Sequence, residues 1–193
     1  IIKLALGISF LPFVYSSTVS FLKQLVRLDH LAVSHFWYGL ITFLVIYLFV
    51  WEAQIVYNAG HKVLEFIFSF FQPLVKVAPY LLPVYVIVIF LIYLVLAVFV
   101  DNARLVNITM FLFGLSFILH LTFSSKAIRS KKGDMLKSNY IFGFSFIYIV
   151  NLGLLAFILN VIFRDFSFVN FCNNSYAIAA DILERVFSQL FAV

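Results

Sequence analysis

Long apolar runs with almost no charge constrain this chain more than any other feature. The clearest run covers residues 80–100 and contains no charged side chain. A helix needs about 20 mostly apolar residues to cross a bilayer, so this run predicts a membrane-spanning helix. Charged residues make up 11% of the 193 residues, far below the roughly 25% of a soluble domain. We therefore predict an all-α integral membrane protein whose surface faces lipid.

Six segments come close to the length and hydrophobicity of a membrane span. They cover residues 1–22, 35–51, 54–71, 80–100, 105–123 and 139–163. We predict a polytopic bundle of about six spans over residues 1–163, or five spans if the first segment, which contains Pro12, does not cross. Only Glu52 and Ala53 separate the second and third segments. These form either two spans or one long bent helix, and we favour two.

Residues 164–193 differ from the bundle and form a second predicted region. A polar-aromatic connector at 164–174 leads into an amphipathic helix at 175–193, which Asn174 or Ser175 can cap. The apolar stripe of this helix has helical spacing and comprises Ile178, Ile182, Leu183, Val186, Phe187, Leu190 and Phe191. We expect this C-terminal helix to lie on the outer leaflet or to pack on a partner subunit.

The basic residues predict the orientation of the bundle. If six spans alternate, loops 23–34, 72–79 and 124–138 share one side of the membrane. That side carries Lys23, Arg27, Lys76, Lys126, Arg129, Lys131, Lys132 and Lys137, and the other side carries Lys3, Arg104, Arg164 and Arg185. Cytoplasmic loops are enriched in Lys and Arg, so 124–138 is predicted to be cytoplasmic and the C-terminus outside. This placement explains the net charge of +5 without a nucleic-acid partner.

Five of the polar residues inside predicted spans form a candidate intramembrane cluster. They are His61, Lys62, Glu65, His120 and Asn151. A charge in hydrocarbon costs about 2.5–3.5 kcal/mol on insertion scales, so each needs a partner or a function. Three interpretations stay open: a Lys62–Glu65 ion pair with a hydrogen-bonded His61, a metal held by His61 and Glu65, or a proton or ion pathway. The single cysteine, Cys172, excludes an intrachain disulfide and a cysteine-based zinc site.

Several motifs occur in an order that resembles a bacterial membrane family related to site-2 zinc proteases. The resemblance covers roughly two-thirds of the chain. Its motifs are Tyr57-Asn58-Ala59-Gly60-His61, Ala78-Pro79-Tyr80-Leu81-Leu82-Pro83-Val84-Tyr85, His120-Leu121-Thr122-Phe123, Lys132-Gly133-Asp134 and Asn151. The resemblance implies a bacterial cytoplasmic membrane, with His61 as the first zinc ligand and Asp134 as the distal carboxylate ligand.

Two departures from the protease motif His-Glu-x-x-His argue against catalysis. Lys62 stands at the general base and Glu65 at the second imidazole. Hydrolysis needs a carboxylate that takes a proton from zinc-bound water, and a cationic Lys62 cannot do so. We therefore predict a pseudoprotease without catalytic residues or cofactor, acting as a structural or accessory subunit among other membrane protein subunits. The alternatives are an active zinc protease that uses His61, Glu65 and Asp134, and a small transporter or proton-conducting subunit.

Overall fold

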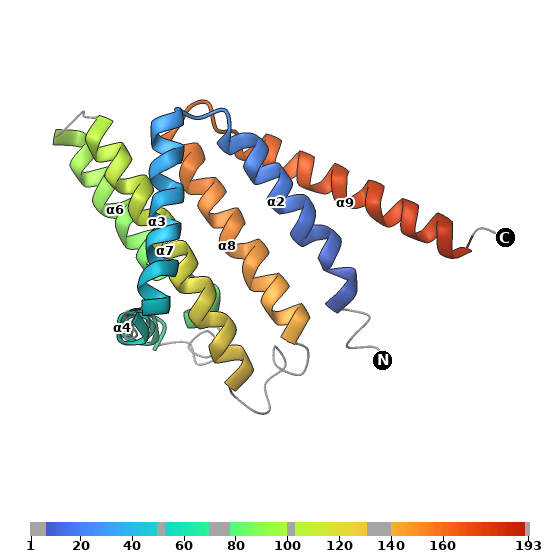
Figure 1. The fold of residues 1–193 in the computed structure, drawn as a ribbon, viewed down its shortest axis with the longest axis horizontal. Coiled ribbons are helices and arrows are strands. Elements are labelled where there is room, and N and C mark those ends of the chain that lie inside the picture. Colours follow the sequence, from blue (N-terminus) through green and yellow to red (C-terminus); the bar gives the residue numbers. More distant parts are fainter. Residues whose placement is uncertain (1–6, 50–52, 70–77, 100–102, 131–139, 192–193) are drawn as a thin grey trace. The chain divides into compact units, whose positions relative to one another are not determined.

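A computed structural model describes residues 7–49, 53–69, 78–99, 103–130 and 140–191. These residues are almost entirely helical and contain no strand, which confirms the all-α prediction. The helices are α2 (Leu11–Leu25), α3 (His30–Phe49), α4 (Ala53–Ile67), α6 (Val84–Phe99), α7 (Ala103–Ser130), α8 (Tyr140–Ile162) and α9 (Phe168–Phe191) (Figure 1). Each predicted span contains one of these helices.

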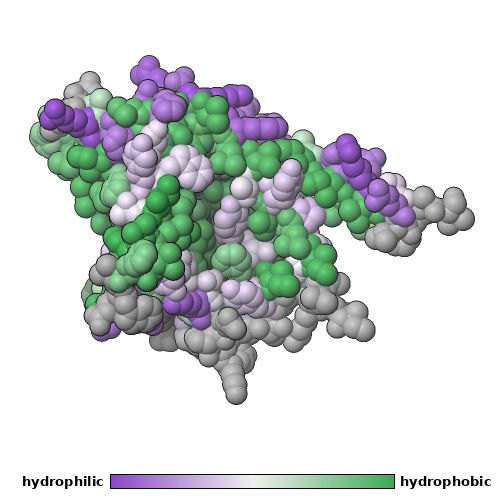
Figure 2. Space-filling view, viewed as in Figure 1, coloured by the Kyte–Doolittle hydropathy of each residue, from purple (hydrophilic) through white to green (hydrophobic). Residues whose placement is uncertain are grey.

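Three helices are long and apolar enough to cross a membrane. They cover His30–Phe49, Ala103–Ile128 and Tyr140–Ile162. α6 is equally apolar but has only 16 residues. Apolar side chains cover much of the helical surface in view in Figure 2. The structure therefore supports an integral membrane protein, whereas it does not confirm six spans.

The chain divides into two compact units. The first unit combines Ile1–Leu28 with Lys131–Val193, and the second unit covers Asp29–Ser130. α9, predicted as a separate surface element, packs along α2 within the first unit. The first unit thus contains helices α2, α8 and α9, and the second unit contains α3, α4, α6 and α7.

In the first unit α2 and α8 run in the same direction. At their starts, the rings of Phe10 and Phe142 lie 4.7 Å apart. At their ends, the backbone N–H of Ser167 donates to Gln24 Oε1 at 3.2 Å. The buried face of α2 combines the fully buried polar side chains of Ser16, Ser20 and Gln24 with the apolar Phe21 and Leu25. The two serines are small residues of the kind that let membrane helices approach closely.

In the second unit α3 and α7 also run in the same direction, at very short range. A Cβ atom on Gly39 would lie 1.9 Å from the carbonyl oxygen of Phe111, so only glycine fits this contact. Two turns later, the ammonium of Lys126 lies 4.7 Å from the ring centre of Tyr47. Later residues of α3 therefore contact later residues of α7, as expected for parallel helices.

These directions do not agree with the predicted span at 54–71. Six alternating spans would make α3 and α7 antiparallel, because both α4 and α6 would cross between them. The structure instead has α3 and α7 parallel, and Figure 1 shows α4 nearly end-on while α3 and α7 run across the view. α4 has only 15 residues and a strongly amphipathic sequence. An amphipathic helix suits a position at the membrane surface, and α4 lies across the other helices of its unit.

Three helix boundaries differ from the prediction for local reasons. Pro12 lies in the first turn of α2, where its missing N–H is tolerated, rather than interrupting a span. α9 begins at Phe168 instead of 175, because Ser167 Oγ accepts a hydrogen bond from the Asn170 N–H at 3.2 Å and caps the helix. α7 continues to Ser130, so the first part of the predicted loop 124–138 is helical.

Candidate functional site

The second unit brings two predicted site residues together that are far apart in the sequence. His61 comes from α4 and His120 from α7, and a helical turn at 78–81 lies beside both. We define the His61–His120 cluster as Tyr57, His61, Tyr80, His120 and Ser124. Four of its members form two pairs within helices: Tyr57 precedes His61 by four residues, and Ser124 follows His120 by four. That spacing places each pair on one helix face.

The imidazole of His120 joins α7 to the turn at 78–81. Its Nε2 atom lies 3.2 Å from the Tyr80 carbonyl oxygen and 3.2 Å from Ser124 Oγ. A carbonyl oxygen only accepts hydrogen bonds, so Nε2 carries the proton. The side chain is buried, at 5% exposure. His120 is therefore a donor that links two segments of the unit.

Tyr57 extends this hydrogen-bonded chain to α4. Its hydroxyl lies 3.4 Å from Ser124 Oγ. Burial raises the pKa of the Tyr57 phenol to about 12, so the hydroxyl keeps its proton at neutral pH. The chain of contacts from Tyr57 through Ser124 and His120 to Tyr80 ties three segments of the second unit together.

Aromatic rings surround both imidazoles. The ring centre of Tyr57 lies 6.0 Å from that of His61 and 6.1 Å from that of His120. The rings of His61 and Tyr80 meet edge to face at 5.1 Å. Such contacts add roughly 0.5–1.5 kcal/mol each beyond the area they bury. The phenol of Tyr57 thus packs against both histidines.

Glu65 pairs with His61 rather than with Lys62. The distance from His61 Nε2 to Glu65 Oε1 is 3.3 Å, at the i,i+4 spacing that shares a helix face. Lys62 is exposed, and the described residues show no ion pair between it and Glu65. The predicted Lys62–Glu65 pair is therefore wrong. Consecutive helical residues differ by about 100° in direction, which turns Lys62 away from the face that carries His61.

Gly60, which precedes the histidine, has a packing role. A Cβ atom there would lie 2.9 Å from the ring of Tyr85. The same tyrosine donates its hydroxyl proton to the carbonyl oxygen of Val56, one turn earlier in α4. Gly60 and Tyr85 therefore hold α4 against the start of α6. Packing against Tyr85 therefore explains the glycine of the Gly-His pair without a metal.

The described residues of the cluster do not fit a zinc site. Zinc requires at least three protein ligands, and no three His, Cys, Asp or Glu side chains come together as a metal site in the described part of the chain. His61 and Glu65 supply two, while His120 directs Nε2 to a carbonyl oxygen. Asp134, the third ligand that the resemblance implies, lies outside the described residues.

Of the five residues of the predicted intramembrane cluster, Asn151 is the one in the first unit. It lies in α8 of the first unit, where it is fully buried and its amide donates to the Ile147 carbonyl oxygen at 2.8 Å. Sequence reasoning therefore grouped residues from both units. It also missed Tyr57, Tyr80 and Ser124, whose only signal was their four-residue spacing from a histidine or their place in the Ala-Pro-Tyr segment.

No protein-family model matches this chain, and neither a curated protein nor a solved structure matches it. The resemblance to site-2 proteases therefore stays a prediction from sequence motifs. The geometry of the cluster and the surfaces of the helices are the features that bear on function.

Proposed function

We propose that this chain is a non-catalytic integral membrane protein that serves as a structural or accessory subunit of a larger membrane complex. The proposal is supported by the contacts of the polar side chains in the His61–His120 cluster, which connect separate segments of the second unit. His120 Nε2 bonds the Tyr80 carbonyl oxygen and Ser124, and Tyr57 packs between the two imidazoles. These groups join helices, which is a structural role.

The position of Lys62 supports the same proposal. An ammonium stands where a zinc protease needs its general base, and it lies on the exposed face of α4. Glu65, which stands at the second imidazole position, is engaged by His61 at 3.3 Å. Neither residue is arranged to activate a water molecule for hydrolysis.

The second half of α9 offers a surface for another subunit. In its middle, the stripe residues Ile178 and Ile182 are half-buried. Further along, Val186 is 44% exposed and Phe187 is 58% exposed. The apolar stripe thus continues past the part that the first unit covers. Exposed apolar stripes of this kind mark contacts with protein or lipid.

We further propose a topology of five crossings in a bacterial cytoplasmic membrane. α2, α3, α6, α7 and α8 cross, and α4 lies at the side where α3 ends. Residues 26–29 and 163–167 then share the outer side, and 131–139 lies in the cytoplasm. The cytoplasmic side carries Lys3, Lys62, Lys76, Lys126, Arg129, Lys131, Lys132 and Lys137, and Lys23, Arg27, Arg104, Arg164 and Arg185 face outward. The excess of basic residues inside agrees with the rule for cytoplasmic loops.

Single-cysteine labelling tests this topology. In a Cys172→Ser background, Val26→Cys, Asp165→Cys and Ser130→Cys each receive a membrane-impermeant maleimide applied to intact cells. We expect Val26→Cys and Asp165→Cys to react, and Ser130→Cys to react only after the membrane is opened. Six alternating spans would instead group Val26→Cys with Ser130→Cys, and that result would overturn the five-crossing topology.

Purification in mild detergent from the native membrane tests the function. We expect the full chain to elute with other membrane proteins in fixed ratio, and Val186→Ser/Phe187→Ser to release them while the fold persists by circular dichroism. A partnerless monomer that holds one equivalent of zinc, lost in His61→Ala, would contradict the proposal. As a positive control for zinc, Lys62→Glu/Glu65→His restores the His-Glu-x-x-His pattern.

A further inference from the structure

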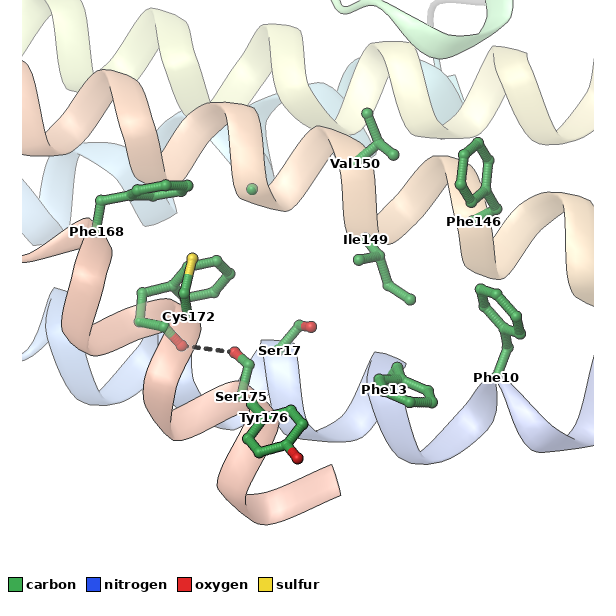
Figure 3. A pocket seen from close by; sticks show the side chains of 12 residues that line it. Phe10, Phe13, Ser17, Phe146, Ile149, Val150, Phe168, Cys172, Ser175 and Tyr176 are labelled. Atoms are coloured by element: carbon green, nitrogen blue, oxygen red, sulfur yellow. Dashed lines mark hydrogen bonds between the residues drawn. The ribbon is translucent and has the colours of Figure 1, made fainter. Parts of the chain in front are cut away.

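The first unit contains a groove of about 510 Å³ between α2, α8 and α9. This volume falls in the range of roughly 300–1,000 Å³ typical of small-molecule sites. No charged side chain lines the groove, and its walls are mostly aromatic and aliphatic (Figure 3). Nothing in the His61–His120 cluster belongs to it, since that cluster lies in the second unit. The groove therefore needs an explanation of its own.

The groove has two chemically different ends. One end, between the starts of α2 and α8, is formed by Phe10, Phe13, Phe146 and Ile149. The other end, beside the first turns of α9, carries neutral polar groups from Ser17, Cys172, Ser175 and Tyr176 (Figure 3). An elongated molecule with a hydrocarbon part and an uncharged polar part matches this division.

Ser17 supplies a free polar atom at the second end. The neighbouring hydroxyls of Ser16 and Thr18 donate to backbone carbonyls one turn earlier in α2. The Ser17 side chain, at 5% exposure, forms no hydrogen bond with any of the described residues. Figure 3 shows its hydroxyl directed into the groove. A hydroxyl donor that faces the groove can pair with an acceptor oxygen of a ligand.

Gly153 provides the hollow itself. A Cβ atom on this glycine, in the wall that α8 contributes, would meet no other atom within 4 Å. A glycine inside a helix costs about 1 kcal/mol relative to alanine, and here no close helix contact requires it. Its effect is to leave space where any side chain would reduce the groove.

We propose that this groove binds one acyl chain of a membrane glycerolipid. The chain lies among the aromatic residues at the first end, and an ester carbonyl accepts a hydrogen bond from Ser17 at the second. The second end lies beside the first turns of α9, which follows α8 in the chain. Cys172 and Tyr176 are exposed, which leaves the groove open to the bilayer. Because no charge lines the groove, the lipid's charged headgroup stays outside it.

Photo-crosslinking of the full chain in vesicles tests the proposal. The vesicles consist of phosphatidylcholine with a trace of phosphatidylcholine that carries a diazirine at the end of one acyl chain. We expect adducts to concentrate on peptides with Phe10, Phe13 or Phe146, and to fall several-fold in Gly153→Phe. Val161→Phe, which adds the same ring at an exposed position of α8 outside the groove, is the matched control and should leave the adducts unchanged.

Other results would overturn the assignment. Adducts spread evenly over lipid-facing helices, and unchanged in Gly153→Phe, would show ordinary bilayer contact. Organic extraction of the purified protein that yields a stoichiometric hydrophobic molecule other than a glycerolipid would identify a different ligand, and a co-purified protein crosslinked at the groove would identify a partner helix. Circular dichroism checks the fold of Gly153→Phe. Ser17→Val, which removes only the hydroxyl donor, should weaken lipid retention in native mass spectrometry without loss of helix content.

Discussion

Glycines occur inside helices of both units, but their surroundings are opposite. In the second unit, a Cβ on Gly39 would lie 1.9 Å from the Phe111 carbonyl oxygen, and one on Gly114 would lie 2.0 Å from that of Phe36. In the first unit, a Cβ on Gly153 would touch nothing within 4 Å. Close backbone approach is the main source of attraction between helices in lipid. The second unit uses its glycines to close a contact, and the first unit keeps a hollow open.

The polar side chains follow the same division. In the second unit, His120 and its partners form hydrogen bonds between segments in the interior. In the first unit, Gln24 forms one such bond to Ser167, while Ser17 faces the groove without a partner among the described residues. A closed, hydrogen-bonded interior suits a scaffold. A hollow with an unused donor suits a ligand. Substitutions at these positions test this difference.

The largest effect is expected at the α3–α7 crossing. Gly39→Ala places a methyl group against a backbone carbonyl, so the helices must separate, and we expect a loss of about 1–3 kcal/mol, with more for Gly39→Leu. Gly153→Ala should do the reverse and stabilise the protein by up to about 1 kcal/mol, because alanine favours the helix and meets open space. Unfolding by sodium dodecyl sulfate in mixed micelles, followed by circular dichroism, measures both. Equal effects of the two substitutions would remove the distinction between the units.

The next effect concerns the central donor of the His61–His120 cluster. His120→Ala leaves the buried carbonyl of Tyr80 without its partner and opens a cavity beside Tyr57, so we expect a loss of about 1–3 kcal/mol. Lys62→Ala, an exposed position in the same unit, should change the stability by less than about 0.5 kcal/mol. The same unfolding assay applies. If both variants kept the stability of the wild type, the cluster would not be a structural element.

A smaller effect is expected for the corresponding link in the first unit. Gln24 is fully buried and accepts one hydrogen bond from the backbone of Ser167, so Gln24→Ala should cost about 1–2 kcal/mol. Val26→Ala, two residues away at an 81% exposed site, is the control. Hydrogen exchange at the start of α9 should increase in Gln24→Ala only. Unchanged exchange would show that the α2–α9 contact does not depend on this bond.

The smallest effect is expected at the surface of α9. Arg185 Nε lies 3.0 Å from Asp181 Oδ1, but both side chains are more than half exposed. An exposed i,i+4 pair contributes about 0.3–0.5 kcal/mol, so Arg185→Ala should shift stability by no more than that. The shift should also vanish in high salt, because added ions screen exposed charges. A large, salt-independent loss would indicate that this face of α9 is buried by a partner.

Much of the fold could be predicted from the sequence, because the relevant signals are local. Apolar runs placed a helix in each of the six segments, and the stripe from Ile178 to Phe187 marked the amphipathic α9. The candidate site was predicted less well. His61, Glu65 and His120 were singled out together with Asn151, which lies in the other unit, and the partners Tyr57, Tyr80 and Ser124 were missed. Hydropathy does not record which distant residues meet.

The proposal that α4 does not cross also depends on the three-dimensional arrangement. Its length and polarity were visible in the sequence, yet an alternating count of spans remained consistent with them. The contact of Gly39 with Phe111 and that of Tyr47 with Lys126 revealed that α3 and α7 run in parallel. The free energy of transfer of a segment from water to lipid depends on the composition of that segment alone. Apolar membrane helices can therefore be predicted from one sequence. Close packing between distant segments determines the helix directions, the groove beside Gly153 and the proximity of His61 to His120. Short-range sequence patterns do not encode such packing.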